Sequence, residues 1–79
     1  MSWKESNDSL TKTFVFKSFE DAMNWMQKAA KKIDQLNHHP EWTNIYNTIH
    51  VKLNTHDAGG IVTEKDHQLA SILDDISTR

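Results

Sequence analysis

Residues 10–36, which read LTKTFVFKSFEDAMNWMQKAAKKIDQL, decide the fold because they predict a strand followed directly by an amphipathic helix. In the first seven residues every second side chain, from Leu10 to Phe16, points to one face, and this period of two is typical of a strand. Ser18 and Asp21 then form the capping pattern that starts a helix. Trp25 falls at the border of the apolar stripe of this helix, where we expect it to pack at the core edge or to contact another subunit. The stripe recurs at steps of three and four residues and consists of Phe19, Ala22, Met23, Met26, Ala29, Ala30, Ile33 and Leu36.

Two further strands are predicted in the middle of the chain. The helix should stop before Pro40, because proline disfavours the α conformation in the residue that precedes it. Between Trp42 and Asn54 the side chains alternate in two short runs, which we expect to be strands joined near residues 47–48. If the second strand continues in register, His56 falls on its polar side, away from the helices.

A turn and a second helix complete the sequence. Residues 57–60, DAGG, predict the turn, because glycines allow a positive φ. Thr63 and Asp66 repeat the capping pattern and open a helix. A short edge strand is also possible near Trp3. The fold class is therefore α+β, with one antiparallel sheet, both helices packed on one face and the other face open. The apolar positions of the last helix are Leu69, Ile72, Leu73 and Ile76.

Size and composition limit the classes of protein that this chain can represent. Residues 1–79 are too few for two cores, so we expect a single domain. With 37% apolar residues and no cysteine, the domain can use neither disulfides nor a thiolate zinc site, which favours self-association, at least as a homodimer. The net charge of −2 without a basic stripe argues against nucleic-acid binding. No long apolar run or signal peptide is present, so we expect no membrane association and a cytoplasmic location.

Five histidines in 79 residues are the most distinctive chemical feature of the sequence. His38 and His39 lie in the loop after the first helix, and His56 follows a strand. Because imidazole titrates near neutral pH, one histidine can donate a proton while another accepts one. A solvated or loop-fixing role remains an alternative for each. A metal site is disfavoured, since neighbouring histidines in an extended segment point apart. We expect His50 and His67 to be surface residues.

Several motifs extend from about Trp3 to Ile76, and together they resemble one known family. The motifs are Leu10-x-Lys12-x-Phe14-x-Phe16, Phe19-x-x-Ala22, Asp34-x-x-x-His38-His39-Pro40-Glu41-Trp42, Asn44-x-Tyr46-Asn47, His50-Val51-x-Leu53-x-Thr55-His56, Gly60 and Asp66-x-x-Leu69-Ala70. A string of this length resembles the pterin-4a-carbinolamine dehydratases. That resemblance implies a four-stranded antiparallel sheet with helices on one side, and assembly as dimers or tetramers.

The resemblance also implies a reaction and a site. The family removes water from 4a-hydroxytetrahydropterin to give quinonoid dihydropterin, which recycles the cofactor of aromatic amino-acid hydroxylases, and needs neither a metal nor a redox cofactor. His38 and His56 are then the expected acid and base, and His39 is expected to bind or orient the pterin. For Asp34 we expect polarisation of His38, while Trp42 is expected to wall the pocket. Asp66 completes the set expected to bind or orient substrate.

Two other functions are compatible with the same resemblance. Some family members act as dimerisation partners of a transcription factor, so the chain could be a non-catalytic interaction module; the His38, His39 and His56 set argues for chemistry instead. A related pterin is also a possible ligand. Two departures from the family pattern concern structure. The usual additional N-terminal helix has no counterpart here, and residues 59–63 are one residue longer than the common form, so stability, assembly or the position of Asp66 could differ.

Overall fold

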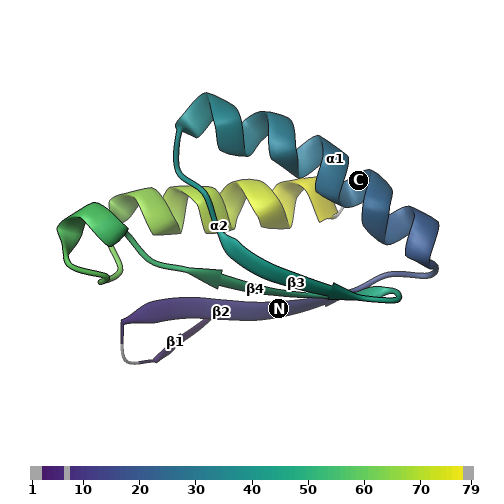
Figure 1. The fold of residues 1–79 in the computed structure, drawn as a ribbon, viewed down its shortest axis with the longest axis horizontal. Coiled ribbons are helices and arrows are strands. Elements are labelled where there is room, and N and C mark those ends of the chain that lie inside the picture. Colours follow the sequence, from purple (N-terminus) through teal and green to yellow (C-terminus); the bar gives the residue numbers. More distant parts are fainter. Residues whose placement is uncertain (1–2, 7, 78–79) are drawn as a thin grey trace.

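The computed structural model describes residues 3–6 and 8–77, and in these residues it contains four strands and two α-helices. The strands form one antiparallel sheet in the order β1-β2-β4-β3. Both helices lie across the same face of this sheet (Figure 1). The α+β class and the four-stranded antiparallel sheet are therefore confirmed. The elements are β1 (Lys4–Ser6), β2 (Ser9–Val15), α1 (Phe19–Leu36), β3 (Glu41–Ile45), β4 (Thr48–Leu53), the 3₁₀ turn η1 (His56–Ala58) and α2 (Glu64–Ser77).

The short strand expected near Trp3 is β1, which pairs with β2 at one edge of the sheet. Residues 1, 2 and 7 of this segment lie outside the described residues. Within the described ranges, no helix is long and apolar enough to cross a membrane.

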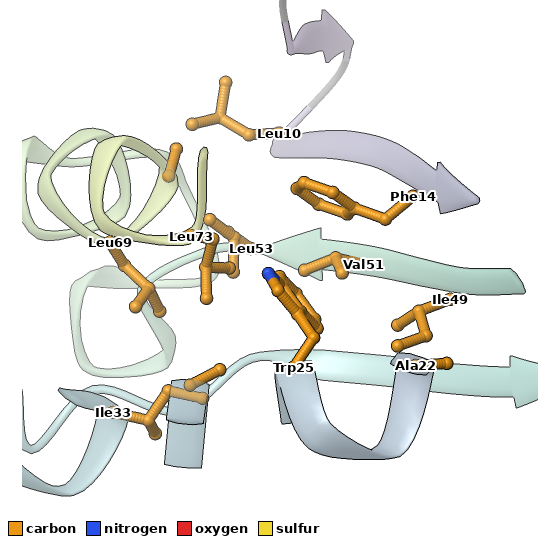
Figure 2. Close-up of a cluster of buried hydrophobic side chains, with 12 residues drawn as sticks. Leu10, Phe14, Ala22, Trp25, Ile33, Ile49, Val51, Leu53, Leu69 and Leu73 are labelled. Atoms are coloured by element: carbon orange, nitrogen blue, oxygen red, sulfur yellow. The ribbon is translucent and has the colours of Figure 1, made fainter. Parts of the chain in front are cut away.

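The core lies between the sheet and the two helices. Leu10 pairs with Leu53, and Phe14 pairs with Ile49, so the period-two pattern places these side chains on the helical face of β2 and β4. Figure 2 shows this cluster, with Trp25 of α1 in the middle. Its twelve buried members are Leu10, Phe14, Ala22, Trp25, Ala29, Ile33, Ile49, Val51, Leu53, Leu69, Ala70 and Leu73.

Trp25 is a central core residue, which corrects the expectation of a border position or a subunit contact. Its side chain is 4% exposed, and its ring centroid lies 4.8 Å from that of Phe14 and 5.9 Å from that of Trp42. Small residues on the neighbouring turns of α1, Ala22 and Ala29, make room for the indole. The buried stripe is therefore rotated from the predicted one: Phe19 and Ala30 are exposed.

The end of α1 places the first two histidines. Asn37 adopts the left-handed conformation (φ 53°), and its N–H donates to the carbonyl of Asp34. The N–H of His38 donates to the carbonyl of Ile33 at 3.4 Å, as in a common helix C-terminus. The helix thus ends at Leu36, before Pro40 as predicted, and His38 lies directly beside its last turn.

Candidate active site at one end of the sheet

A hollow of about 310 Å³ lies where the chain enters β3 and where it leaves β4. All three histidines expected to be catalytic line it: His38 and His39 from the loop after α1, and His56 from the start of η1. The β3–β4 hairpin brings these segments together, because it pairs the beginning of β3 with the end of β4. The other lining residues are Asn37, Pro40, Glu41, Lys52, Asn54, Thr55, Asp57 and Lys65.

The hollow is at the end of the sheet and not on its open face, which corrects the expected position of His56. Strand β4 ends at Leu53, and the N–H of Thr55 then donates to the carbonyl of Ile61 at 2.8 Å. Gly59 and Gly60, with φ of 89° and 76°, turn the chain back to make this bridge. His56 consequently starts η1 in place of continuing the strand. On the open face the histidine is His50, whose Nδ1 lies 2.9 Å from Thr13 Oγ1.

The buried partner of His38 is Asp66. The distance from His38 Nε2 to Asp66 Oδ1 is 2.6 Å, and the two side chains are 10% and 0% exposed. Asp34 was expected to polarise His38, but its carboxylate lies 3.1 Å from His39 Nε2 on the surface. That expectation is wrong because Asp34 occupies an exposed side of α1, while the first turn of α2 faces the imidazole of His38.

The second carboxylate oxygen of Asp66 is also saturated with donors. Thr55 Oγ1 donates to Oδ2 at 2.7 Å, and the N–H of Thr63 donates to it at 2.9 Å. Burial by itself would raise the pKa of Asp66, but the hydrogen bonds from His38, Thr63 and Thr55 outweigh it, so the pKa lies below its ordinary value. Asp66 is therefore an ionised carboxylate held inside the protein.

The other two histidines of the hollow are accessible to solvent. The His39 side chain is 59% exposed in its pair with Asp34, and His56 is exposed at the start of η1. A contact this exposed contributes little to stability, so it does not fix the His39 imidazole, and the exposed His56 imidazole is not held by burial. The hollow thus combines one fixed histidine with two adaptable ones.

Trp42 does not line this hollow. It pairs with Val51 on the helical face of the sheet and packs against the core beside Trp25. Tyr46 lies in the β3–β4 turn and is 65% exposed. The expected part of Trp42 in substrate binding remains a prediction.

In the described part of the chain, no group of three or more His, Asp or Glu side chains is arranged to hold a metal ion. His38 already directs one nitrogen to Asp66. The donor groups of the hollow suit proton transfer and hydrogen bonding.

Sequence reasoning did not identify Thr55 and Thr63 as parts of the site. Their hydroxyl oxygens lie 2.6 Å apart, and both residues contact Asp66. The available signal was the capping pattern at the start of α2, which places the Asp66 carboxylate near the N–H of Thr63. Nothing in the spacing indicates that the same carboxylate also reaches Thr55 and His38.

The fold and the hollow define a small α+β protein in which histidines and a buried carboxylate meet at the end of an antiparallel sheet. Residues 1–76 match the model of the family described as pterin 4 alpha carbinolamine dehydratase, and the chain belongs to that family. A relative from Opitutus terrae, provisionally named a pterin-4-alpha-carbinolamine dehydratase, is 51% identical over 95% of this chain and 77% of its own. A relative of the same provisional name from Roseobacter denitrificans is 47% identical over 92% and 74%.

Solved structures share this fold. The crystal structure of a Brucella melitensis protein described as a transcriptional coactivator/pterin dehydratase has a TM-score of 0.89 and 38% identity, covering 95% of this chain and 81% of that one. A pterin dehydratase-like protein described as a RuBisCO assembly factor in the alpha-carboxysome has a TM-score of 0.83 over 98% of this chain and 90% of that one. At 19% identity, that second likeness concerns the fold alone.

Proposed function

We propose that this protein dehydrates 4a-hydroxytetrahydropterin to quinonoid dihydropterin by histidine acid–base catalysis, within tetrahydropterin recycling. The observation that carries the proposal is the convergence of His38, His39 and His56 on one hollow. Membership of the dehydratase family supports the same substrate class.

The reaction needs two proton transfers and no change of oxidation state. An acid protonates the hydroxyl oxygen at C4a, the C4a–O bond breaks, and water leaves. A base removes the proton from N5, and the electron pair of that N–H bond forms the C4a–N5 double bond. One proton is given and one is taken, so an imidazole pair suffices. Each positioned acid or base typically contributes about 10²–10⁴-fold to the rate.

The geometry supports a division of labour among the histidines. His38 is buried and held by Asp66, so it suits the transfer that needs the better-defined direction. His56 lines the same hollow, is exposed, and suits the second transfer. His39, paired with Asp34 at the rim, suits orientation of the pterin ring.

A stopped-flow assay on chemically generated 4a-hydroxytetrahydropterin tests this function directly. We expect the purified protein to accelerate loss of the carbinolamine well above the spontaneous rate, with equal rates in the presence and absence of a chelator. A rate equal to the spontaneous one would reject the dehydratase proposal and favour a non-catalytic role, such as that of a transcriptional coactivator, the description given to the relative from Brucella melitensis. Activity lost with the chelator would reject metal-free catalysis.

Self-association is the expected source of additional stability. A domain of 79 residues buries only about 60% of its unfolded surface, and large apolar side chains remain outside: Val15 is 68% exposed, Ile45 63% and Tyr46 65%. We therefore expect the melting temperature to rise with protein concentration, because association stabilises the folded state by mass action. Sedimentation of a monomer whose melting temperature is independent of concentration would contradict this.

A cytoplasmic location also stays a prediction.

A further inference from the structure

We propose that Thr55 and Thr63 are positioning residues whose hydroxyl groups hold Asp66 so that His38 keeps a proton on Nε2 and transfers protons through Nδ1. The proposal deepens the dehydratase function and rests on it. It assigns a role to two threonines in the reaction and names the reacting nitrogen of His38.

The direction of the hydroxyl relay follows from the number of protons available. Thr55 Oγ1 lies 2.7 Å from Asp66 Oδ2 and 2.6 Å from Thr63 Oγ1. An ionised carboxylate can only accept, so the single hydroxyl proton of Thr55 points to Asp66. The hydroxyl of Thr63 must then donate to Thr55. The relay therefore runs in one direction, from Thr63 through Thr55 to the carboxylate.

The same argument fixes the tautomer of His38. Asp66 Oδ1 accepts only, and its distance of 2.6 Å to His38 Nε2 is that of a charge-assisted hydrogen bond. Nε2 therefore carries a hydrogen whether the imidazole is neutral or cationic. Only Nδ1 can gain or lose a proton while this bond is kept.

His38 Nδ1 has no hydrogen-bond partner among the described residues and is not fully buried. Among the described residues, Trp25 Nε1 is the only fully buried side-chain nitrogen or oxygen without a hydrogen-bond partner. His38 lines the hollow, and its only side-chain hydrogen bond in that part of the chain is the one from Nε2. Nδ1 is thus open to solvent or to a bound ligand, whereas Nε2 points into the protein.

Thr55 matters because Asp66 has no access to water. With the carboxylate 0% exposed, loss of the Thr55 donor cannot be replaced by solvent. The carboxylate would then rotate or bind a proton, and either change releases the imidazole from its fixed orientation. A small displacement of a catalytic group can lower the reaction rate strongly, by up to about 10²-fold for 1 Å.

The test compares Thr55→Val, which keeps the side-chain shape, with Thr55→Ser, which keeps the hydroxyl. For Thr55→Val we expect kcat to fall about tenfold with KM changed less than about twofold. We also expect the pKa of Asp66, followed by carboxyl ¹³C NMR, to rise. Thr55→Ser should restore both. In the wild-type protein, ¹⁵N NMR of neutral His38 should show the hydrogen on Nε2.

Several results would overturn the proposal. They are a hydrogen on Nδ1 in neutral wild-type His38, an unchanged kcat in Thr55→Val, and an unchanged Asp66 pKa in that variant. Neither NMR measurement needs substrate. If the wild-type protein has no dehydratase activity, the proposed function is rejected, and the NMR measurements still test the hydroxyl relay. If Thr55→Val does not fold, Thr63→Val replaces it: that variant keeps the backbone N–H on Asp66, and an unchanged kcat there would equally count against the relay.

Discussion

Replacing His38 with glutamine and His56 with alanine in one protein should lower the dehydration rate at least a hundredfold while the fold stays intact. The expected loss follows from the typical contribution of about 10²–10⁴-fold for each positioned acid or base. Glutamine is chosen at position 38 because its amide can still donate a hydrogen bond to the buried Asp66, whereas alanine would leave that carboxylate without its partner. His56 is exposed, so its truncation costs little stability.

Matched controls come from the two histidines outside the hollow. His50 lies on the open face of the sheet and His67 on an exposed side of α2. His50→Ala and His67→Ala remove the same chemical group and should leave the rate within about twofold, since surface substitutions rarely disturb a distant site. Circular dichroism and stopped-flow turnover of the wild type, the double variant and the two controls test whether the fold is kept and whether the rate falls. Full activity in the double variant would end the acid–base assignment.

The local elements were predictable because each depends on a short stretch of sequence. Alternation in residues 10–16 indicates β2, and the capping residues Ser18 and Thr63 mark the starts of α1 and α2. The side chain of Ser18 does accept a hydrogen bond from the N–H of Asp21. These features are decided within one turn or one strand.

Trp25 and His56 were placed wrongly for two different physical reasons. The buried side of α1 is set by the side chains that it packs against: Phe14 of β2 and Phe16, just after that strand, give the indole of Trp25 a better environment than the helix border would. At His56, the choice between a continued strand and a 3₁₀ turn depends on the bridge from Thr55 to Ile61. Both outcomes are tertiary effects that override a local pattern.

The partner of His38 could not be read from spacing alone. Asp34 is close in sequence and at a helical interval, yet the hydrogen bond goes to Asp66, which is far along the chain. Bringing the start of α2 against the end of α1 requires both helices to pack on the same face of the sheet. The sequence therefore predicts which residue types take part, and the fold decides which of them meet.

Replacing Asp66 is expected to have the largest effect on stability. Asp66→Ala removes the carboxylate that accepts hydrogen bonds from His38, Thr55 and the N–H of Thr63. Asp66 is 0% exposed, so water does not replace this acceptor. Breaking one partner of a buried pair typically costs about 3–5 kcal/mol, which is a large part of the stability of a small domain. Urea denaturation measures the loss. Asp34→Ala is the control, since that carboxylate is 80% exposed and its removal should cost about 0–1 kcal/mol.

The same carboxylate should also make stability depend on pH in a defined direction. The pKa of Asp66 is lower in the folded protein than its ordinary value of 3.8, so below about that pH the unfolded chain binds more protons than the folded one. The stabilisation is fully present above 3.8 and is lost as the pH falls through the folded-state pKa. In Asp66→Asn no proton can bind, so this part of the acid dependence should disappear from urea denaturation curves. The NH₂ group of an amide at position 66 would face one of the groups that now donate a hydrogen bond to the carboxylate. This change favours the other His38 tautomer, and we expect turnover to fall at least about tenfold. Identical acid dependence in the wild-type and Asp66→Asn proteins would show that the carboxylate does not carry the charge that the site requires.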